Sequence, residues 1–216
     1  MVNILLYASL IIIIFSFVVY FLVLIFTNNK ISKSDGFDIT KDIISEYNSI
    51  NVIESKSYIT SYNIKRKVIK LSTKVYYGNK VSDIALALIE AGISIIDNSG
   101  NKFISFMKNI FSNLKILYVL PLISLMINFS TYNISDAKTS IVFVSVFSIL
   151  SYFMIDVKEQ ACSWLKDNIS KIKELNKSNS KMLINYINKL LWLDKFLFLG
   201  ELTIILRCIA ILLEFN

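Results

Sequence analysis

One carboxylate, Glu90, stands in the middle of the otherwise apolar stretch ALALIEAGISII at residues Ala85–Ile96. Glutamate is among the few side chains that act as a general base in catalysis. An isolated carboxylate is unfavourable in apolar surroundings, so a function or a specific partner must keep Glu90 there. Three environments are open to it, namely burial beside a basic side chain, burial in the protonated form, or contact with water. The candidate basic partners are Lys65, Arg66, Lys67 and Lys70.

The chemistry available to the chain is narrow, because its 216 residues include no histidine. No imidazole can act as a general base, complete a nucleophilic triad or bind zinc. The two cysteines, Cys162 and Cys208, are far apart and form no C-x-x-C pair, so we expect free thiols and no thiolate metal site. Any reaction would therefore depend on carboxylates, lysines, hydroxyl groups or tyrosines.

The composition is that of a membrane protein. Hydrophobic residues make up 55% of the chain, against about 45–50% in ordinary soluble domains. Residues 1–29 carry no charged side chain and contain more than the roughly 20 apolar residues that cross a bilayer. A signal peptide would need a basic start and a shorter apolar core, which this segment lacks. We therefore expect an uncleaved transmembrane anchor over residues 1–29.

Further apolar segments lie in the second half of the chain. Residues 116–156 contain two of them, separated by a short turn, which predicts a transmembrane helical hairpin with Pro121 inside its first helix. Residues 193–216 are also apolar but contain Glu201 and Arg207. A charge at the bilayer centre costs about 2.5–3.5 kcal/mol on insertion scales. We still expect a fourth span there, with a helix lying on the membrane or packed against the other spans as the alternative.

The distribution of charge predicts the topology. Residues 30–115 contain 13 Lys/Arg against 8 Asp/Glu, and residues 157–190 contain 7 lysines against 3 acidic residues. With four spans both polar stretches lie on one side, and the excess of positive charge makes that side cytoplasmic. The net charge of +7 is explained by this topology, and no nucleic-acid-binding motif accompanies it. We expect a multi-pass protein of the plasma membrane, with the lipid bilayer as one partner.

The first polar stretch predicts a small α+β domain, and residues 157–192 predict a cytoplasmic helical segment. A helix should begin at the capping residue Thr40, and the sequence NVIES at residues 51–55 should form a short strand. A second strand should end in a turn near Ser72. Asn79 or Ser82 should then cap the helix that holds Glu90. The expected fold class is mostly α, an integral membrane protein with about four transmembrane helices and one small α+β domain.

The stretch Tyr58–Ser94 resembles a known family, the membrane-bound neutral zinc metallopeptidases of bacteria (the YugP-like group). The sequence KVIKLSTKVYYG corresponds to the family pattern K-V-V-R-L-S-x-x-V-Y-x-G, and ALIEAGIS stands where active members carry A-H-E-x-G-H-A. The order of anchor, domain, hairpin, polar helix and final span is also similar. The resemblance implies a zincin-like cytoplasmic domain at the inner membrane of a bacterial cell.

The family motif works through two histidines that share one helical face and hold a zinc ion, while the glutamate activates the metal-bound water. A downstream carboxylate is the third ligand. In this chain the histidine positions hold Ile89 and Ile93, and Glu90 keeps the position of the base. The resemblance places the third ligand at Asp156. Isoleucine cannot bind a metal, and carboxylates without nitrogen or sulfur partners make a poor zinc site.

The resemblance thus predicts a pseudoenzyme with no catalytic residue, no metal and no cofactor. Ile89 and Ile93 are expected to be packing residues, Glu90 to have a structural rather than a binding role, and Asp156 to be a solvated residue at a helix start. The expected function is that of a scaffold or regulator that binds a membrane-protein partner. One alternative is an active metallopeptidase in which Glu90, Asp156 and a further carboxylate such as Asp97 hold a harder metal. Another is a structural or lipid-interacting subunit of a membrane complex.

Overall fold

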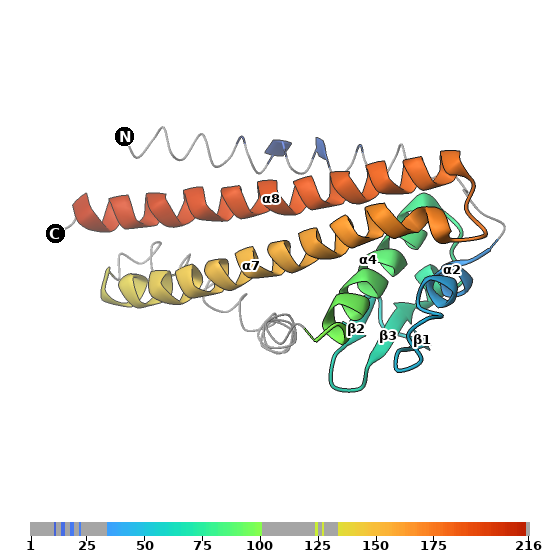
Figure 1. Ribbon diagram of the computed structural model, residues 1–216. Helices are drawn as coiled ribbons and strands as arrows, with labels where there is room; N and C mark the ends of the chain where they lie inside the picture. The colour runs from blue at the N-terminus through green and yellow to red at the C-terminus, as the bar shows by residue number, and fades with distance from the viewer. Residues whose placement is uncertain are drawn as a thin grey trace. The chain divides into compact units, whose positions relative to one another are not determined.

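The computed structural model describes residues 34–100 and 134–214, together with positions 11, 14, 15, 18, 19, 22, 124 and 127. The chain divides into two compact units. One, which we call the apolar unit, comprises Met1–Val19, Met107–Ile155 and Leu193–Asn216, and the other, the polar unit, comprises Tyr20–Phe106 and Asp156–Trp192. Two long helices, α7 (Ile134–Asn168) and α8 (Lys177–Glu214), contribute to both units (Figure 1).

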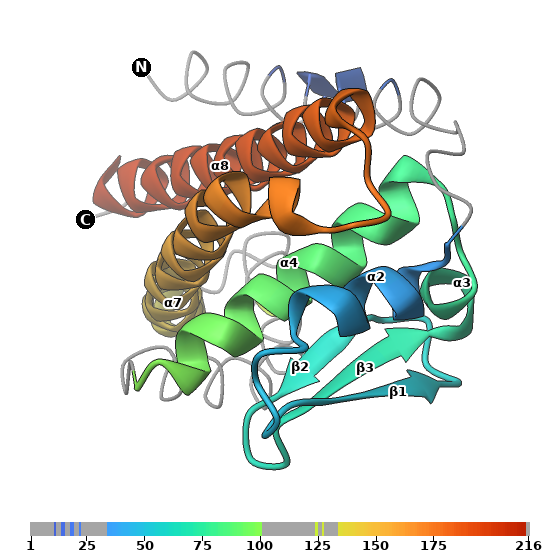
Figure 2. The ribbon, with the colours of Figure 1, turned by 45° about the vertical axis from the view of Figure 1, so that its right-hand side comes forward.

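The polar unit contains a three-stranded sheet with the order β1-β3-β2. Strand β1 (Asn51–Ser55) runs parallel to β3 (Val68–Ser72), with Asn51 opposite Val68. The short strand β2 (Ser61–Asn63) pairs antiparallel with the other side of β3 and forms an edge of the sheet. Strand β1 occupies the residues at which the sequence predicts a strand. Helices α2 and α4 lie over the same face of the sheet (Figure 2).

Helix α2 (Gly36–Ile43) begins five residues before the helix that was predicted to follow the cap Thr40. The side chain of Asp35 is the actual cap, since its Oδ1 accepts a hydrogen bond of 3.0 Å from the Asp38 N–H. Thr40 is buried inside the helix, where its hydroxyl donates to the Gly36 carbonyl at 2.6 Å. The prediction of the start was wrong because both residues are good caps and the earlier one is used.

Helix α4 (Val81–Asn98) carries the stretch that contains Glu90 and follows the short helix α3 (Thr73–Tyr76). Its N-cap is Lys80, which makes no side-chain cap hydrogen bond, so the predicted caps Asn79 and Ser82 were wrong. Asp83 lies in the first turn, where a carboxylate is favoured by the helix dipole.

The apolar core of the polar unit joins segments that are far apart in sequence. Helix α4 approaches α7 closely at Gly92, where a Cβ atom would lie 3.2 Å from both the Cβ and the carbonyl oxygen of Ala161. The largest fully buried side chains include Ile39, Ile69, Leu71, Ile84, Leu88, Ile93, Leu165, Ile169, Leu183 and Ile187. Residues 156–192 are therefore packed into the same unit as α4 and the sheet.

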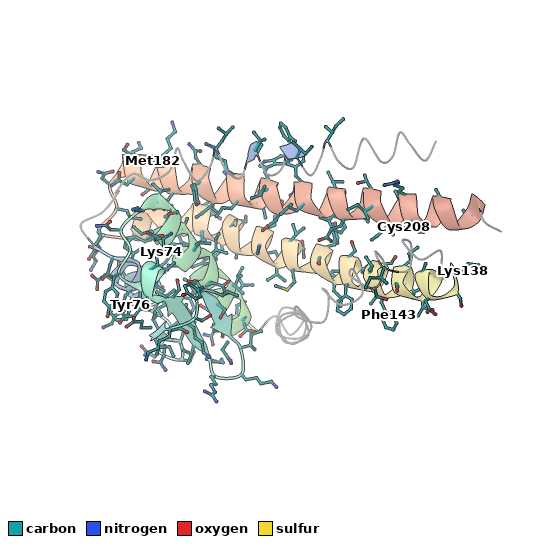
Figure 3. The ribbon with its side chains drawn as sticks, turned by 180° about the vertical axis from the view of Figure 1, so that it is seen from behind. Lys74, Tyr76, Lys138, Phe143, Met182 and Cys208 are labelled. Carbon is teal, nitrogen blue, oxygen red and sulfur yellow. The ribbon has the colours of Figure 1, made fainter. Side chains whose placement is uncertain are left out.

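The apolar unit places the first part of α7 beside the second part of α8. The rings of Tyr152 and Phe198 lie 5.4 Å apart, and the ring of Phe15 lies 5.8 Å from that of Phe196. Many apolar side chains point outward, among them Phe143 at 55% exposure (Figure 3). Such an outer surface suits a lipid environment better than water.

One helix within the described residues, Ser135–Lys171, is long and apolar enough to cross a membrane. This result does not confirm the predicted four spans. The anchor over 1–29 and the first helix of the predicted hairpin lie mostly outside the described residues. The described part of the predicted last span, residues 193–214, belongs to α8 and does not meet the same test. The fold that the structure supports is mostly helical, with a small sheet and one candidate membrane helix.

Candidate functional site

Glu90 is placed in the middle of α4, where its carboxylate faces strand β2. Its Oε2 accepts a hydrogen bond of 2.7 Å from the main-chain N–H of Tyr62. Because β2 is an edge strand, this N–H lacks a second strand to pair with, and Glu90 supplies the acceptor instead. A hydrogen bond to an ionised carboxylate is stronger than one between neutral groups. This oxygen of Glu90 therefore binds a main-chain donor, which is none of the four basic side chains that the sequence offers as candidates.

Tyr62 is held to α4 at a second point as well. Its hydroxyl donates to Asp97 Oδ2 at 2.8 Å, and only 4% of the residue is exposed. Glu90 and Asp97 are seven residues apart, which is close to two turns of helix, so they lie on the same face of α4. We call Glu90, Tyr62 and Asp97 the α4–β2 cluster. The spacing of the two acids was the one sequence signal that could have pointed to it.

The phenol of Tyr62 is strongly perturbed by this environment. Burial raises the pKa of Tyr62 well above its ordinary value of 10.0, and both the hydrogen bond to Asp97 and the negative charge of Asp97 raise it further. Each of these causes favours the neutral, protonated phenol over the phenolate. The cluster therefore has a structural role. The Tyr62 hydroxyl keeps its proton and continues to donate its hydrogen bond to Asp97, which holds β2 to α4.

The Tyr62→Phe variant should lose about 1 kcal/mol of stability at neutral pH, since one hydrogen bond is removed. In the wild type the phenol is neutral in both states below pH 10.0, its ordinary pKa. Above that pH only the unfolded state loses the proton, so stability falls as the pH rises. Thermal unfolding followed by circular dichroism at pH 8–11 should show a shallower alkaline loss in Tyr62→Phe. Parallel pH profiles of the two proteins would contradict this account.

The two positions that the sequence resemblance assigns to the zinc-binding histidines are part of the core. Ile89 is 8% exposed and Ile93 is 1% exposed. They are four residues apart and share one face of α4, as two ligands of one ion would. Their neighbour Gly92 allows the close approach to α7 at Ala161. Apolar packing thus occupies the place where the family motif would put nitrogen ligands.

Asp156 lies inside α7 and does not start a helix, because α7 runs without interruption from its apolar part into the polar unit. The expectation of a helix-start residue was therefore wrong. Its Oδ2 accepts a hydrogen bond of 2.8 Å from Gln160 Nε2. Among the described residues no group of three His, Cys, Asp or Glu side chains could hold a metal ion. Glu90, Asp97 and Asp156 accordingly do not assemble into a carboxylate metal site.

The two thiols were expected to be free, and the structure agrees. Cys162 is buried in the polar unit, and Cys208 is partly exposed in the second part of α8. Neither forms a disulfide.

A comparison with known families gives one decisive match. The model of the family described as "Putative neutral zinc metallopeptidase" matches residues 1–184. The chain belongs to this family. The matched region includes the sheet, α4 with Glu90, and Asp156 on α7, and it ends near the beginning of α8. Neither a curated protein nor a solved structure matches the chain.

The zinc ion that the family name implies does not fit the side chains of this member. Zinc sites in proteins are built from Cys, His and carboxylate ligands in tetrahedral geometry. The positions on α4 that would supply two ligands hold Ile89 and Ile93, both buried. Glu90 binds the main chain of β2 through one of its oxygens. The donor set needed for zinc is therefore not present at this place.

Proposed function

We propose that this chain is a non-catalytic member of the zinc metallopeptidase family and acts as a membrane scaffold or regulator that binds a membrane-protein partner. One observation carries the proposal. The side chain in the position of the general base, Glu90, accepts a hydrogen bond from the Tyr62 main chain at 2.7 Å and lies between two isoleucines. The chain keeps the sequence framework of the family, and the Glu90 carboxylate stabilises the fold instead of taking part in a reaction.

A catalytic role would require a different environment for Glu90. The glutamate of this motif removes a proton from water, and that water is acidic enough only when a metal ion binds it. A carboxylate without such a water has no acidic proton within reach. In this chain the carboxylate stabilises the contact between α4 and β2, so its retention follows from folding rather than from hydrolysis.

The experiment that tests the proposal is a peptide-cleavage assay on the full-length protein purified in detergent. Zn²⁺, Mn²⁺ and Ca²⁺ are added in separate reactions, and the Glu90→Gln variant is run beside the wild type. We expect no cleavage that depends on Glu90, because any residual activity from a contaminant is the same in both proteins. Cleavage by the wild type that disappears in Glu90→Gln would show an active peptidase and reject the proposal.

We further propose a multi-pass arrangement in the plasma membrane with the polar unit on the cytoplasmic side. The candidate span Ser135–Lys171 supports it, and so does the excess of basic residues in the two polar stretches. In this arrangement residues 1–29, 116–133 and 193–216 supply the other three spans. The beginning of α7, which contains Lys138, then lies on the outer side.

Single cysteines test this topology in a background without Cys162 and Cys208. We expect a cysteine in place of Lys138 to react with a membrane-impermeant maleimide on intact cells, and one in place of Lys177 to stay unlabelled. Lysis should make the second position reactive, which controls for its local exposure. The opposite pattern in intact cells would reverse the proposed orientation.

A further inference from the structure

Arg207 is a cation within an apolar segment. It lies in the second part of α8, next to Cys208, which is labelled in Figure 3. Its Nε atom is buried and has no hydrogen-bond partner. Within the part of the chain that the structure describes, the guanidinium group forms no hydrogen bond and no ion pair. A cation in such a setting is unfavourable unless an anion meets it.

The nearest acidic residue along the helix is not placed to pair with Arg207. Glu201 lies six residues before Arg207, which is roughly 9 Å along the helix axis and about 120° around it. The two side chains therefore leave α8 on different faces and at different depths. Glu201 also has an interaction of its own elsewhere. Among the side chains of α8 that the structure describes, none is a counter-ion for Arg207.

The surroundings of Arg207 are apolar. This part of α8 packs beside the apolar part of α7, as the contact between Tyr152 and Phe198 shows. Its outward residues are apolar and substantially exposed: Leu199 at 48%, Leu206 at 54%, Ile209 at 38% and Leu213 at 70%. Apolar side chains at these positions can contact either lipid or another transmembrane helix.

We propose that Arg207 forms an ion pair with a carboxylate on a transmembrane helix of a partner protein. Charge complementarity selects the occupant, because a guanidinium group binds a carboxylate through two parallel hydrogen bonds. The proposal rests on the membrane placement and partner binding of the proposed function, and it does not depend on the loss of catalysis. The segment lies beyond residue 184, where the family match ends. The contact is thus a feature of this chain outside the matched framework.

The first test uses the purified full-length chain, without a partner, in phosphatidylcholine vesicles. Thermal unfolding is compared between the wild type, Arg207→Leu and Arg207→Lys. If Arg207 lacks a partner within the chain, Arg207→Leu should unfold at the same temperature as the wild type or higher. A clearly lower unfolding temperature for Arg207→Leu would show an internal counter-ion and overturn the proposal. This measurement also establishes that the variant folds.

The second test finds the counter-ion in native membranes. A photoreactive amino acid replaces Ala210, which lies one turn from Arg207 on the same side of α8. We expect a protein adduct whose cross-linked peptide is an apolar helix containing Asp or Glu. Its yield should fall at least about tenfold in Arg207→Leu, which corresponds to 1.4 kcal/mol, and persist in Arg207→Lys and in Glu201→Gln. Exchanging the charges, with Arg207→Asp and an arginine in the partner, should restore the adduct.

Other outcomes reject the proposal. Adducts with lipid alone would show that a headgroup phosphate or the acyl chains contact this face. Adducts with a second copy of the chain, or with a helix that has no carboxylate, would assign the face to a different occupant. An adduct yield that is the same in Arg207→Leu as in the wild type would show that the charge of Arg207 does not contribute to the interaction. None of these results would affect the peptide-cleavage test. The proposal of an Arg207 ion pair can therefore be rejected while the proposal of a non-catalytic protein stands.

Discussion

Replacing Ile93 with alanine is expected to destabilise the polar unit by about 2–5 kcal/mol, the usual range for truncating a fully buried isoleucine. The residue is 1% exposed, and the family resemblance assigns its position to a zinc ligand. The loss should be large because the side chain is enclosed in the core of the polar unit, next in sequence to Gly92, where α4 approaches Ala161 of α7 closely.

The rate at which Cys162 is alkylated measures this loss of stability of the polar unit. In a Cys208→Ser background Cys162 is the remaining thiol, and it is 2% exposed, so it reacts only when the unit opens. The alkylation rate of Ile93→Ala should rise at least about 30-fold, since each 1.4 kcal/mol is a factor of ten. Ile59→Ala is the matched control, because Ile59 is 61% exposed in the same unit. Equal rates in the two variants would contradict the assignment of Ile93 to the core.

Removing the side chain of Glu90 should have the second large effect. Glu90→Ala leaves the Tyr62 N–H without its acceptor, and an unsatisfied donor of this kind costs about 1–3 kcal/mol. Glu90→Gln keeps an acceptor oxygen at nearly the same place, so its effect should be much smaller. Hydrogen exchange of the peptide that contains β2, followed by mass spectrometry, should show faster exchange in Glu90→Ala and near wild-type exchange in Glu90→Gln.

A matched control for this pair is Glu46→Ala, because Glu46 is exposed in the same unit. It should leave the exchange of β2 unchanged. If Glu90→Gln were as damaging as Glu90→Ala, the negative charge rather than the hydrogen bond would be what the protein requires. That result would reject the role assigned to Glu90 in the α4–β2 cluster.

The local sequence predicts strand β1 but not strand β2. Strand β1 is a run of β-formers bounded by polar residues, so its pattern stands out. Strand β2 has only three residues, Ser61–Asn63, which is too short for an alternating pattern to stand out in the sequence. It is held by β3 on one side and by the Glu90 carboxylate on the other. Contacts of this kind join residues 28 positions apart, and local pattern does not reveal them.

Tertiary contacts also decided where α2 begins. Asp35 and Thr40 are both favourable caps, and propensity does not choose between them. In the structure the Gly36 N–H donates to the Gly78 carbonyl at 2.9 Å, and a Cβ on Gly36 would collide with the Val75 carbonyl oxygen. The tight packing of α2 against α3 thus fixes the earlier start, and it depends on residues about 40 positions away.

The candidate site was foreseen in part. Glu90 stands out as the lone carboxylate of an apolar stretch, the family resemblance points to Ile89 and Ile93, and the family membership is confirmed. The part played by Tyr62 was not foreseen, because it depends on which main-chain group of an edge strand faces α4. The course of α7 through Asp156 was missed for a similar reason, since a change from apolar to polar residues was taken as a break between segments.

The central claim is that α4 has exchanged metal ligands for core packing, and metal content tests it most directly. The full-length protein is purified in detergent with an affinity tag that contains no histidine, and zinc is measured by elemental analysis beside the Glu90→Gln variant. Wild type and variant should both contain zinc far below one ion per chain, even after incubation with Zn²⁺ and removal of the excess. One tightly held zinc ion per chain that is lost when Ile93 or Glu90 is replaced would contradict the account.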